Sequence, residues 1–276
     1  SVKARMSARH DRATFTYGNF RNQHPDSLAQ GWETYDARPR FGTNWMGLRG
    51  RLSVLGEGYS NADFSTRVKA TYNFVREVLS VVAEQSAAIK SSIVASDQRR
   101  LDSIAVRSVL APPTQQDVIA EITQPAGEGA GGFARRNRTG VYRSIRMPVF
   151  DRFAPAHKEA VPFAYLLPPR LHEVGDLLRR QGVAVERLTR SARVSAESFP
   201  IDTVVVGPLF EGHRTVQAEG GWSSRPADTT LVGEWLVVRT GQPLGPLAAY
   251  LLEPASEDGV VTWNLLDREL QPGVAY

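Results

Sequence analysis

The apolar positions in the first half of the chain predict one amphipathic helix and a second helical stretch. The first helix is expected from Asp63 to Val82, with Asp63 or Ser65 as its N-cap, because apolar residues recur there every three or four positions. The second stretch runs from about Ala87 to Val109 and ends before Pro112-Pro113. The apolar face of the first helix consists of Val68, Tyr72, Val75, Leu79 and Val82.

The residues before the first helix predict one strand and few other regular elements. The first 60 residues are rich in aromatic and turn-forming residues without a helical period, and Arg51 to Leu55 has the composition of a short strand. Gly56 and Gly58 flank Glu57 directly after this strand. Glycines at such a place either leave the side chain between them open to a cleft or mark a bulge.

A change in composition separates the two halves of the chain. Between Thr123 and Gly140, prolines and glycines follow no apolar period, which predicts a loop or linker. Beyond it, a strand from Val161 to Leu167, an amphipathic helix over 171–178 and a strand from Val183 to Val185 predict a β-α-β unit. Further strands are expected over residues 202–206, 211–216, 233–238 and 248–252.

These patterns predict an α/β part followed by a β-rich part. Residues 1–110 are expected to belong to an α/β domain, 111–140 to form a linker, and 141–276 to form a β-rich accessory domain with one β-α-β element. The chain has 276 residues, of which 42% are hydrophobic, which suffices for a buried core. It contains no run of about 18 apolar residues, so we expect no membrane span.

Charge and cysteine content exclude several classes of function. The net charge of +4 is spread along the chain and does not form the basic stripe of a nucleic-acid-binding protein. The chain has no cysteine, which excludes disulfides, thiolate metal sites and cysteine nucleophiles. This absence fits the cytosol as well as a secreted bacterial protein. No signal peptide is visible, and because the chain begins at Ser1 without an initiating methionine, the natural start is expected upstream.

The histidines and carboxylates of the chain are its candidates for metal binding or for catalysis at a metal-bound water. A zinc site needs three or four converging ligands, and none of the five histidines has H-x-x-H, H-E-x-x-H or H-x-x-E spacing. Glu253, Glu257 and Asp258 fit a calcium site or a solvated turn, and we favour the turn. Glu57 at a strand end could accept a proton from a metal-bound water, or it could pair with Arg49 or Arg51.

Two segments resemble a known family, the zinc carboxypeptidases (M14 peptidases). The stretch 31–41, followed by Thr43-Asn44, Gly47-Leu48-Arg49 and 55–60, is similar to the end of the catalytic domain in a bacterial branch of that family. The motifs within 241–264 resemble the β-rich domain that follows the catalytic domain in long bacterial members. The resemblance implies the fold class of a partial zinc-carboxypeptidase-like α/β domain followed by a β-rich accessory domain.

The resemblance also implies roles for particular residues. In the family, a glutamate at the end of a late central strand activates a zinc-bound water and then protonates the leaving amine, and Glu57 matches that position. Tyr35 matches the mobile tyrosine that covers the substrate. Arg49 and Arg38 are candidates for holding the substrate's terminal carboxylate, because a guanidinium can grip a carboxylate with two hydrogen bonds.

The chain departs from the family pattern in one respect. The H-x-x-E pair and the third zinc-ligating histidine normally precede the glutamate. The residues before Glu57 contain no H-x-x-E pair, and His10 is a candidate for the third ligand. We therefore expect a C-terminal part of a metallocarboxypeptidase, secreted or periplasmic, whose complete form uses zinc and a peptide substrate. The alternative is a non-catalytic module that binds peptide or cell-wall material. The oligomeric state and the substrate side-chain preference stay open.

Overall fold

The computed structural model describes residues 1–22, 24–125 and 136–270, and its chain forms two compact units. Unit 1 consists of Ser1–Asp36, Gly56–Gln85 and Val109–Ala154, and unit 2 consists of Ala37–Leu55, Ser86–Ser108 and Pro155–Tyr276. Each unit is thus assembled from three separate stretches of sequence. This differs from the two contiguous parts, 1–110 and 141–276, that the sequence led us to expect.

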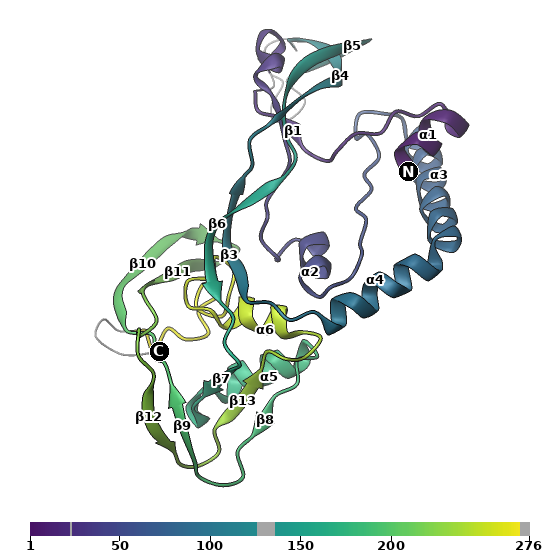
Figure 1. The fold of residues 1–276 in the computed structure, drawn as a ribbon. Helices are drawn as coiled ribbons and strands as arrows, with labels where there is room; N and C mark the ends of the chain where they lie inside the picture. Colours follow the sequence, from purple (N-terminus) through teal and green to yellow (C-terminus); the bar gives the residue numbers. More distant parts are fainter. Residues whose placement is uncertain (23, 126–135, 271–276) are drawn as a thin grey trace. The chain divides into compact units, whose positions relative to one another are not determined.

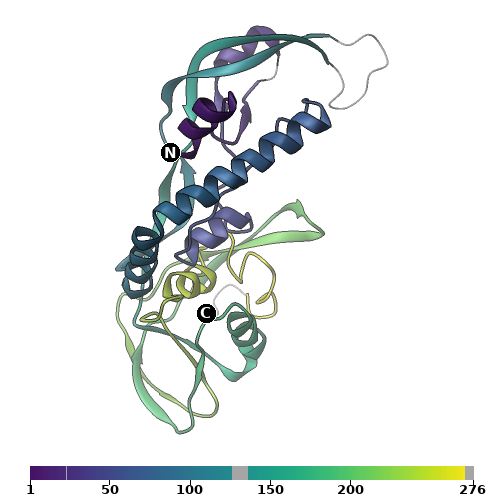
Figure 2. The same ribbon diagram turned by 90° about the vertical axis from the view of Figure 1, so that its right-hand side faces the viewer.

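Two helices of unit 1 pack against each other, α1 (Val2–His10) and α3 (Phe64–Glu84) (Figures 1 and 2). The Asp63 side chain accepts a hydrogen bond of 2.9 Å from the backbone N–H of Thr66, which caps the N-terminus of α3. The predicted helix is therefore confirmed, and of the two candidate caps, Asp63 and Ser65, Asp63 is the N-cap.

The sheet of unit 1 has four strands in the order β1-β2-β5-β4. Strands β4 and β5 are antiparallel, and β2 runs parallel to β5. Buried Val118 and Ala120 alternate with the exposed Ile119, as expected of a strand with one covered face. The strands are β1 (Asn19–Phe20), β2 (Trp32–Glu33), β4 (Thr114–Pro125) and β5 (Arg136–Phe150), and a 3-10 helix, η1 (Pro25–Gln30), lies between β1 and β2.

This sheet changes the interpretation of the predicted linker. Residues 114–125 and 136–140 lie in β4 and β5, so the described ends of the stretch 111–140 are paired strands. Residues 126–135 lie outside the described part of the chain. The proline and glycine content of the middle of this stretch concealed the alternation on its N-terminal side.

The predicted strand from Arg51 to Leu55 is wrong. In unit 2 these residues follow α2 (Gly42–Leu48) and belong to no strand or helix. Leu52 and Val54 are 68% and 62% exposed. A strand is stabilised by hydrogen bonds to a neighbour, and no described strand pairs with this segment.

The predicted second helix is correct only in its first half. Helix α4 (Ser86–Gln98) ends early, and β3 (Ser103–Leu110) follows it and pairs with β6 (Phe153–Ala160). Ile104 and Val106 are buried at alternate positions, which is the period of a strand. Considered alone, none of the described helices is long and apolar enough to cross a membrane, although α3 and α4 together pass this test as a bent pair.

The predicted β-α-β unit is confirmed in unit 2. Strand β7 (Ala164–Leu167) leads through η3 (Pro169–Leu171) into α5 (His172–Arg180) and then β8 (Glu186–Arg187). Both strands pair antiparallel with β13 (Leu236–Arg239), which lies between them, so β7 and β8 are parallel to each other. The first strand begins at Ala164 rather than at Val161, and the second begins at Glu186, after the predicted residues Val183 to Val185.

Two antiparallel pairs of strands complete the sheets of unit 2 (Figure 1). Strand β10 (Ile201–Phe210) pairs with β11 (His213–Gly220), which confirms most of the strands expected over 202–206 and 211–216. Strand β9 (Ala192–Ala196) pairs with β12 (Ala227–Leu231). The chain as a whole is therefore mixed α/β, with several small sheets.

The strand predicted over 248–252 is wrong, because these residues form the end of α6 (Gly245–Leu252). Seven of its eight residues are buried, and the six from Leu247 to Leu252 belong to the main core of unit 2 together with Val106, Leu178 and Val238. A helix that is apolar on all sides shows no helical period, so periodicity alone does not distinguish it from a buried strand.

Candidate functional site

The position of Glu57 is determined by the glycine before it. A Cβ atom on Gly56 would lie 2.7 Å from the ring of Phe74 on α3, so a side chain at this position would clash. A Cβ atom on Gly58 would meet its nearest neighbour, Thr71, at an ordinary 3.4 Å. Gly56 therefore permits the close packing of this segment on α3, and the Glu57 side chain is exposed.

Tyr17 brings Glu57 and Tyr35 together within unit 1. The rings of Tyr17 and Tyr35 contact each other edge to face, with centroids 5.2 Å apart and an interplanar angle of 86°. Burial raises the pKa of Tyr17, and the charge of Glu57, a hydrogen bond to Glu57 and the neighbouring Tyr35 raise it further. The Tyr17 hydroxyl is therefore the hydrogen-bond donor and the Glu57 carboxylate the acceptor.

This cluster contains two of the four site residues predicted from the sequence, Glu57 and Tyr35. The sequence analysis missed Tyr17, which connects them. Its only signal was the aromatic content of the first 60 residues. No spacing rule relates a tyrosine in a loop to a carboxylate about 40 positions later.

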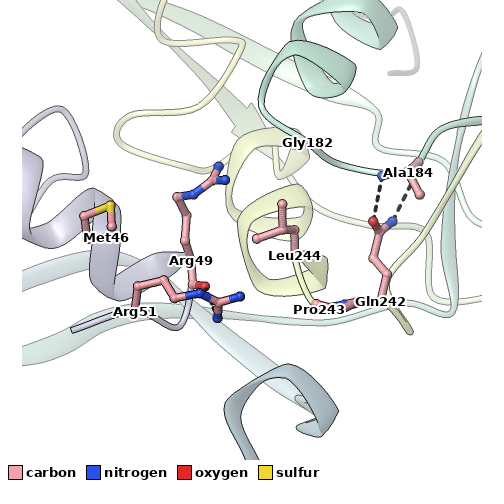
Figure 3. A pocket seen from close by; sticks show the side chains of 8 residues that line it. All are labelled: Met46, Arg49, Arg51, Gly182, Ala184, Gln242, Pro243 and Leu244. Carbon is pink, nitrogen blue, oxygen red and sulfur yellow. Dashed lines mark hydrogen bonds between the residues drawn. The ribbon is translucent and has the colours of Figure 1, made fainter. Parts of the chain in front are cut away.

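Arg49 lies in unit 2, at the C-cap of α2, and lines a pocket of about 640 Å³ (Figure 3). Its Nη1 donates a hydrogen bond of 2.7 Å to the backbone carbonyl of Gln181, and its guanidinium lies 5.7 Å from the ring of Trp45. The pocket is lined by Met46, Arg49, Arg51, Gly182, Ala184, Gln242, Pro243 and Leu244.

The two arginines of the pocket differ in their electrostatic partners. Arg51 forms an ion pair with Asp97, in which Nη1–Oδ1 is 2.7 Å and Nη2–Oδ2 is 3.2 Å. Arg49 forms no ion pair with any residue of the described chain. Its contact with a neutral carbonyl leaves its positive charge uncompensated, and a guanidinium has five N–H donors. Arg49 can therefore accept an anionic ligand.

Arg38, the second candidate anion holder, is not a lining residue of this pocket. Its backbone carbonyl accepts a hydrogen bond of 3.2 Å from Asn44 Nδ2. Within unit 2 its charge acts on Tyr250, whose pKa burial raises and Arg38 lowers. The structure thus does not bring Arg38 and Arg49 together in one anion site.

The described residues do not fit a zinc site. They contain no group of three or more histidine, aspartate or glutamate side chains that could hold a metal ion. His10, the candidate third ligand, forms a contact of 3.0 Å between its Nε2 and Glu77 Oε1. No protein-family model, curated protein or solved structure matches this chain. The likeness to the zinc carboxypeptidases therefore depends on the sequence motifs alone.

The acidic group near the C-terminus is not the solvated turn that we favoured. Asp258 is buried and binds Arg40, with Nε–Oδ1 at 2.8 Å, while the Arg40 guanidinium lies over the rings of Phe210 and Trp263, at 4.6 and 4.7 Å from their centroids. This cation neutralises the carboxylate in the protein interior. The carboxylate is therefore engaged by an arginine within unit 2, and removal of either partner would leave an uncompensated buried charge.

Glu253 is the second buried carboxylate of this group. It accepts hydrogen bonds from the Tyr165 hydroxyl and from Trp222 Nε1, the latter at 3.0 Å. Burial raises the pKa of Glu253, and these two hydrogen bonds oppose the shift. Glu257 accepts a hydrogen bond of 3.0 Å from the backbone N–H of Ser108. The three acids are thus distributed among separate protein partners.

Proposed function

We propose that this chain is part of an enzyme that hydrolyses a peptide or amide bond next to a free C-terminal carboxylate, as the zinc carboxypeptidases do. The observation that carries the proposal is the convergence of Glu57 and Tyr35 on Tyr17. The sequence motifs alone point to both residues, although they are 22 positions apart in the chain. A carboxylate next to two tyrosines provides a proton acceptor and two phenols that can contact a substrate.

In the proposed reaction, Glu57 accepts a proton from the attacking water and returns it to the leaving amine. Tyr17 orients the carboxylate through its hydroxyl, and Tyr35 covers the bound substrate. The exposure of Glu57 leaves it accessible to water and to a peptide. The peptidase-like fold class remains part of this proposal.

Zinc belongs to the proposal only as a property of the complete enzyme. Bound zinc would polarise the scissile carbonyl and lower the pKa of a water molecule. Because the described residues do not supply a ligand set, we derive no step of the reaction through the metal.

The direct test is the Glu57→Gln substitution in the complete enzyme. Glutamine has nearly the same shape but cannot accept the proton, so turnover of a peptide with a free C-terminus should fall by about 10²–10⁴-fold. Release of the C-terminal amino acid is measured by mass spectrometry, with the C-terminally amidated peptide as the substrate control.

Glu234→Gln provides a matched control, because Glu234 is an exposed glutamate that pairs with Arg187 in unit 2. It should leave turnover unchanged. Near-normal turnover of the Glu57→Gln enzyme, with the peptide still bound, would show that Glu57 has only a structural role.

A second candidate function is a non-catalytic module that binds peptide termini or cell-wall material. The uncompensated charge of Arg49 in its pocket favours this alternative. Since a carboxylate is a common anion at peptide ends, we expect a short peptide with a free C-terminus to bind in unit 2, and the same peptide with a C-terminal amide to bind more weakly.

Arg49→Ala tests this function in the 276-residue chain by isothermal titration calorimetry. Loss of charge-assisted hydrogen bonds should weaken binding of the free-carboxylate peptide by about 10- to 100-fold. Arg225→Ala is the control, because Arg225 is an exposed arginine that does not line the pocket. Equal affinity for the acid and the amide would argue against a carboxylate site.

A further inference from the structure

Helix α3 has its apolar and polar faces reversed relative to a helix that packs on a core. Its one buried residue is the carboxylate Glu77, which is 3% exposed. Its apolar face is exposed, with Leu79 at 61%. We name this face the α3 stripe, and it consists of Val68, Tyr72, Val75, Leu79 and Val82.

The polar side of α3 is already occupied by α1. Glu77 contacts Arg9 Nη1 at 3.1 Å and His10 Nε2 at 3.0 Å, and Glu84 binds Arg5 Nη1 at 2.8 Å. Helix α1 therefore uses both acidic residues of α3. The α3 stripe lies on the side of the helix that α1 does not cover.

The spacing of the α3 stripe suits a second helix. From Val68 to Val82 the residues follow one another at intervals of four, three, four and three positions. This is the a/d pattern of a coiled-coil seam, with Tyr72 and Leu79 at the a positions. Such residues fit into the spaces between the side chains of a facing helix.

The charged residues beside the α3 stripe indicate the sign of the charge that a partner should carry. Lys69 and Arg76 occupy the e positions next to the seam, and Arg67 lies one position before Val68. None of the three forms an ion pair with a described residue, and the Nε of Arg67 is buried without a hydrogen-bond partner. An acidic partner would supply the missing negative charge.

We propose that the α3 stripe binds an amphipathic helix with an apolar seam and acidic flanking residues. A second copy of this chain does not meet the requirement. In a parallel pair, Thr71 and Val78 at the g positions would face Arg76 and Ala83 at the e positions, so no acid would face a cation. In an antiparallel pair centred on Val75, Arg76 would face Arg76 of the other copy.

A membrane surface is also a poorer match than an acidic helix. Polybasic segments that bind anionic lipids carry about four to eight lysines and arginines. Only three cations lie beside the α3 stripe. The regular alternation of four- and three-residue intervals is a property of helix pairs and is not needed for insertion into lipid.

The experiment uses two synthetic 21-residue helical peptides with the same isoleucine and leucine seam. One carries glutamate at every e and g position, and the other carries lysine. Like charges prevent each peptide from pairing with itself. Fluorescence anisotropy with the 276-residue chain should show at least ten-fold tighter binding of the acidic peptide, and the double substitution Lys69→Glu/Arg76→Glu should reverse the preference.

Leu79→Asp should weaken binding of the acidic peptide by at least ten-fold. Val141→Asp is the control. Val141 is an exposed apolar residue on β5 of the same unit, so this substitution should leave binding unchanged. Circular dichroism verifies that both variants are folded.

Three outcomes would overturn the proposal. The first is equal affinity for both peptides, or no binding of either. The second is a dimer of the chain alone in analytical ultracentrifugation that Leu79→Asp dissociates, which would identify a second copy as the partner. The third is Leu79-dependent binding to phosphatidylglycerol vesicles without binding of the acidic peptide, which would identify a lipid surface.

Discussion

Helices α3 and α6 bury opposite kinds of side chain. In α6, of unit 2, Leu247, Leu252 and their neighbours are buried, and the helix forms part of a core of 24 buried residues. In α3, of unit 1, leucine and valine side chains are exposed and a glutamate is buried. Among the described residues, the buried apolar cluster in the sheet of unit 1 consists of Val118, Met147 and Val149. Helical pattern therefore predicts a helix more reliably than it predicts which face is covered.

The largest difference between the two helices should appear in a matched pair of leucine substitutions. Leu247→Ala removes a side chain that is 0% exposed, so it should lower the free energy of unfolding by about 2–5 kcal/mol. Urea denaturation, followed by tryptophan fluorescence, measures the change. A loss below about 1 kcal/mol would mean that the core around α6 is loosely packed.

The two buried glutamates sharpen the comparison, because their pKa values are shifted in opposite directions. Burial raises the pKa of Glu253, so the ionised side chain lowers the free energy of unfolding at a pH above the folded-state pKa. This destabilisation disappears as the pH falls to the ordinary glutamate pKa. A hydrogen bond from His10, with the charges of Arg9 and His10, lowers the pKa of Glu77 despite its burial. The stabilisation of the folded state by ionised Glu77 is present at neutral pH and is lost as the pH falls through the folded-state pKa of Glu77.

Glu253→Gln should therefore stabilise the protein at pH 7, and the gain should shrink towards pH 4. Glu77→Gln should destabilise it at pH 7, and that loss should persist down to the ordinary glutamate pKa and shrink only below it, as the pH falls through the lowered pKa of Glu77. Thermal melts of both variants and of the unsubstituted protein over this pH range test the signs. A common sign for both substitutions at pH 7 would contradict the electrostatic difference between the two sites.

The smallest effect is expected from Leu79→Ala in α3. The side chain is exposed, and alanine is at least as good a helix former as leucine, so the free energy of unfolding should change by no more than about 0.5 kcal/mol. The same urea experiment applies. A loss similar to that of Leu247→Ala would show that the α3 stripe is covered when the chain is free in solution.

The elements that the sequence predicted well have local signals. Helix α3 has a capping aspartate and a regular apolar period, and the β-α-β unit has turn residues that separate its elements. The errors concern elements whose environment decides their structure. An all-apolar segment such as α6 fits a helix or a strand, and the segment from Arg51 to Leu55 has strand composition but no described neighbour to pair with.

The candidate site was predictable only in part. Glu57, Tyr35 and Arg49 could be selected from motifs, because each motif is continuous in the sequence. Tyr17 could not be selected, because its relation to Glu57 arises from the folding of unit 1. The buried state of the acidic group near the C-terminus could not be predicted for the same reason. The partner of Asp258 is Arg40, which is distant in the sequence, and the composition of the acidic segment does not indicate this pairing.

The contact between Arg40 and Asp258 has a consequence for the time course of biosynthesis. The two residues are 218 positions apart in the chain. At the rates of ribosomal synthesis, roughly 10–40 s pass between the appearance of the arginine and that of its partner. During this interval the segment from Ala37 to Leu55 has no α6 to pack against, and its apolar side chains are available to chaperones. Unit 1, whose last residue is Ala154, can be completed while the end of unit 2 is still being translated.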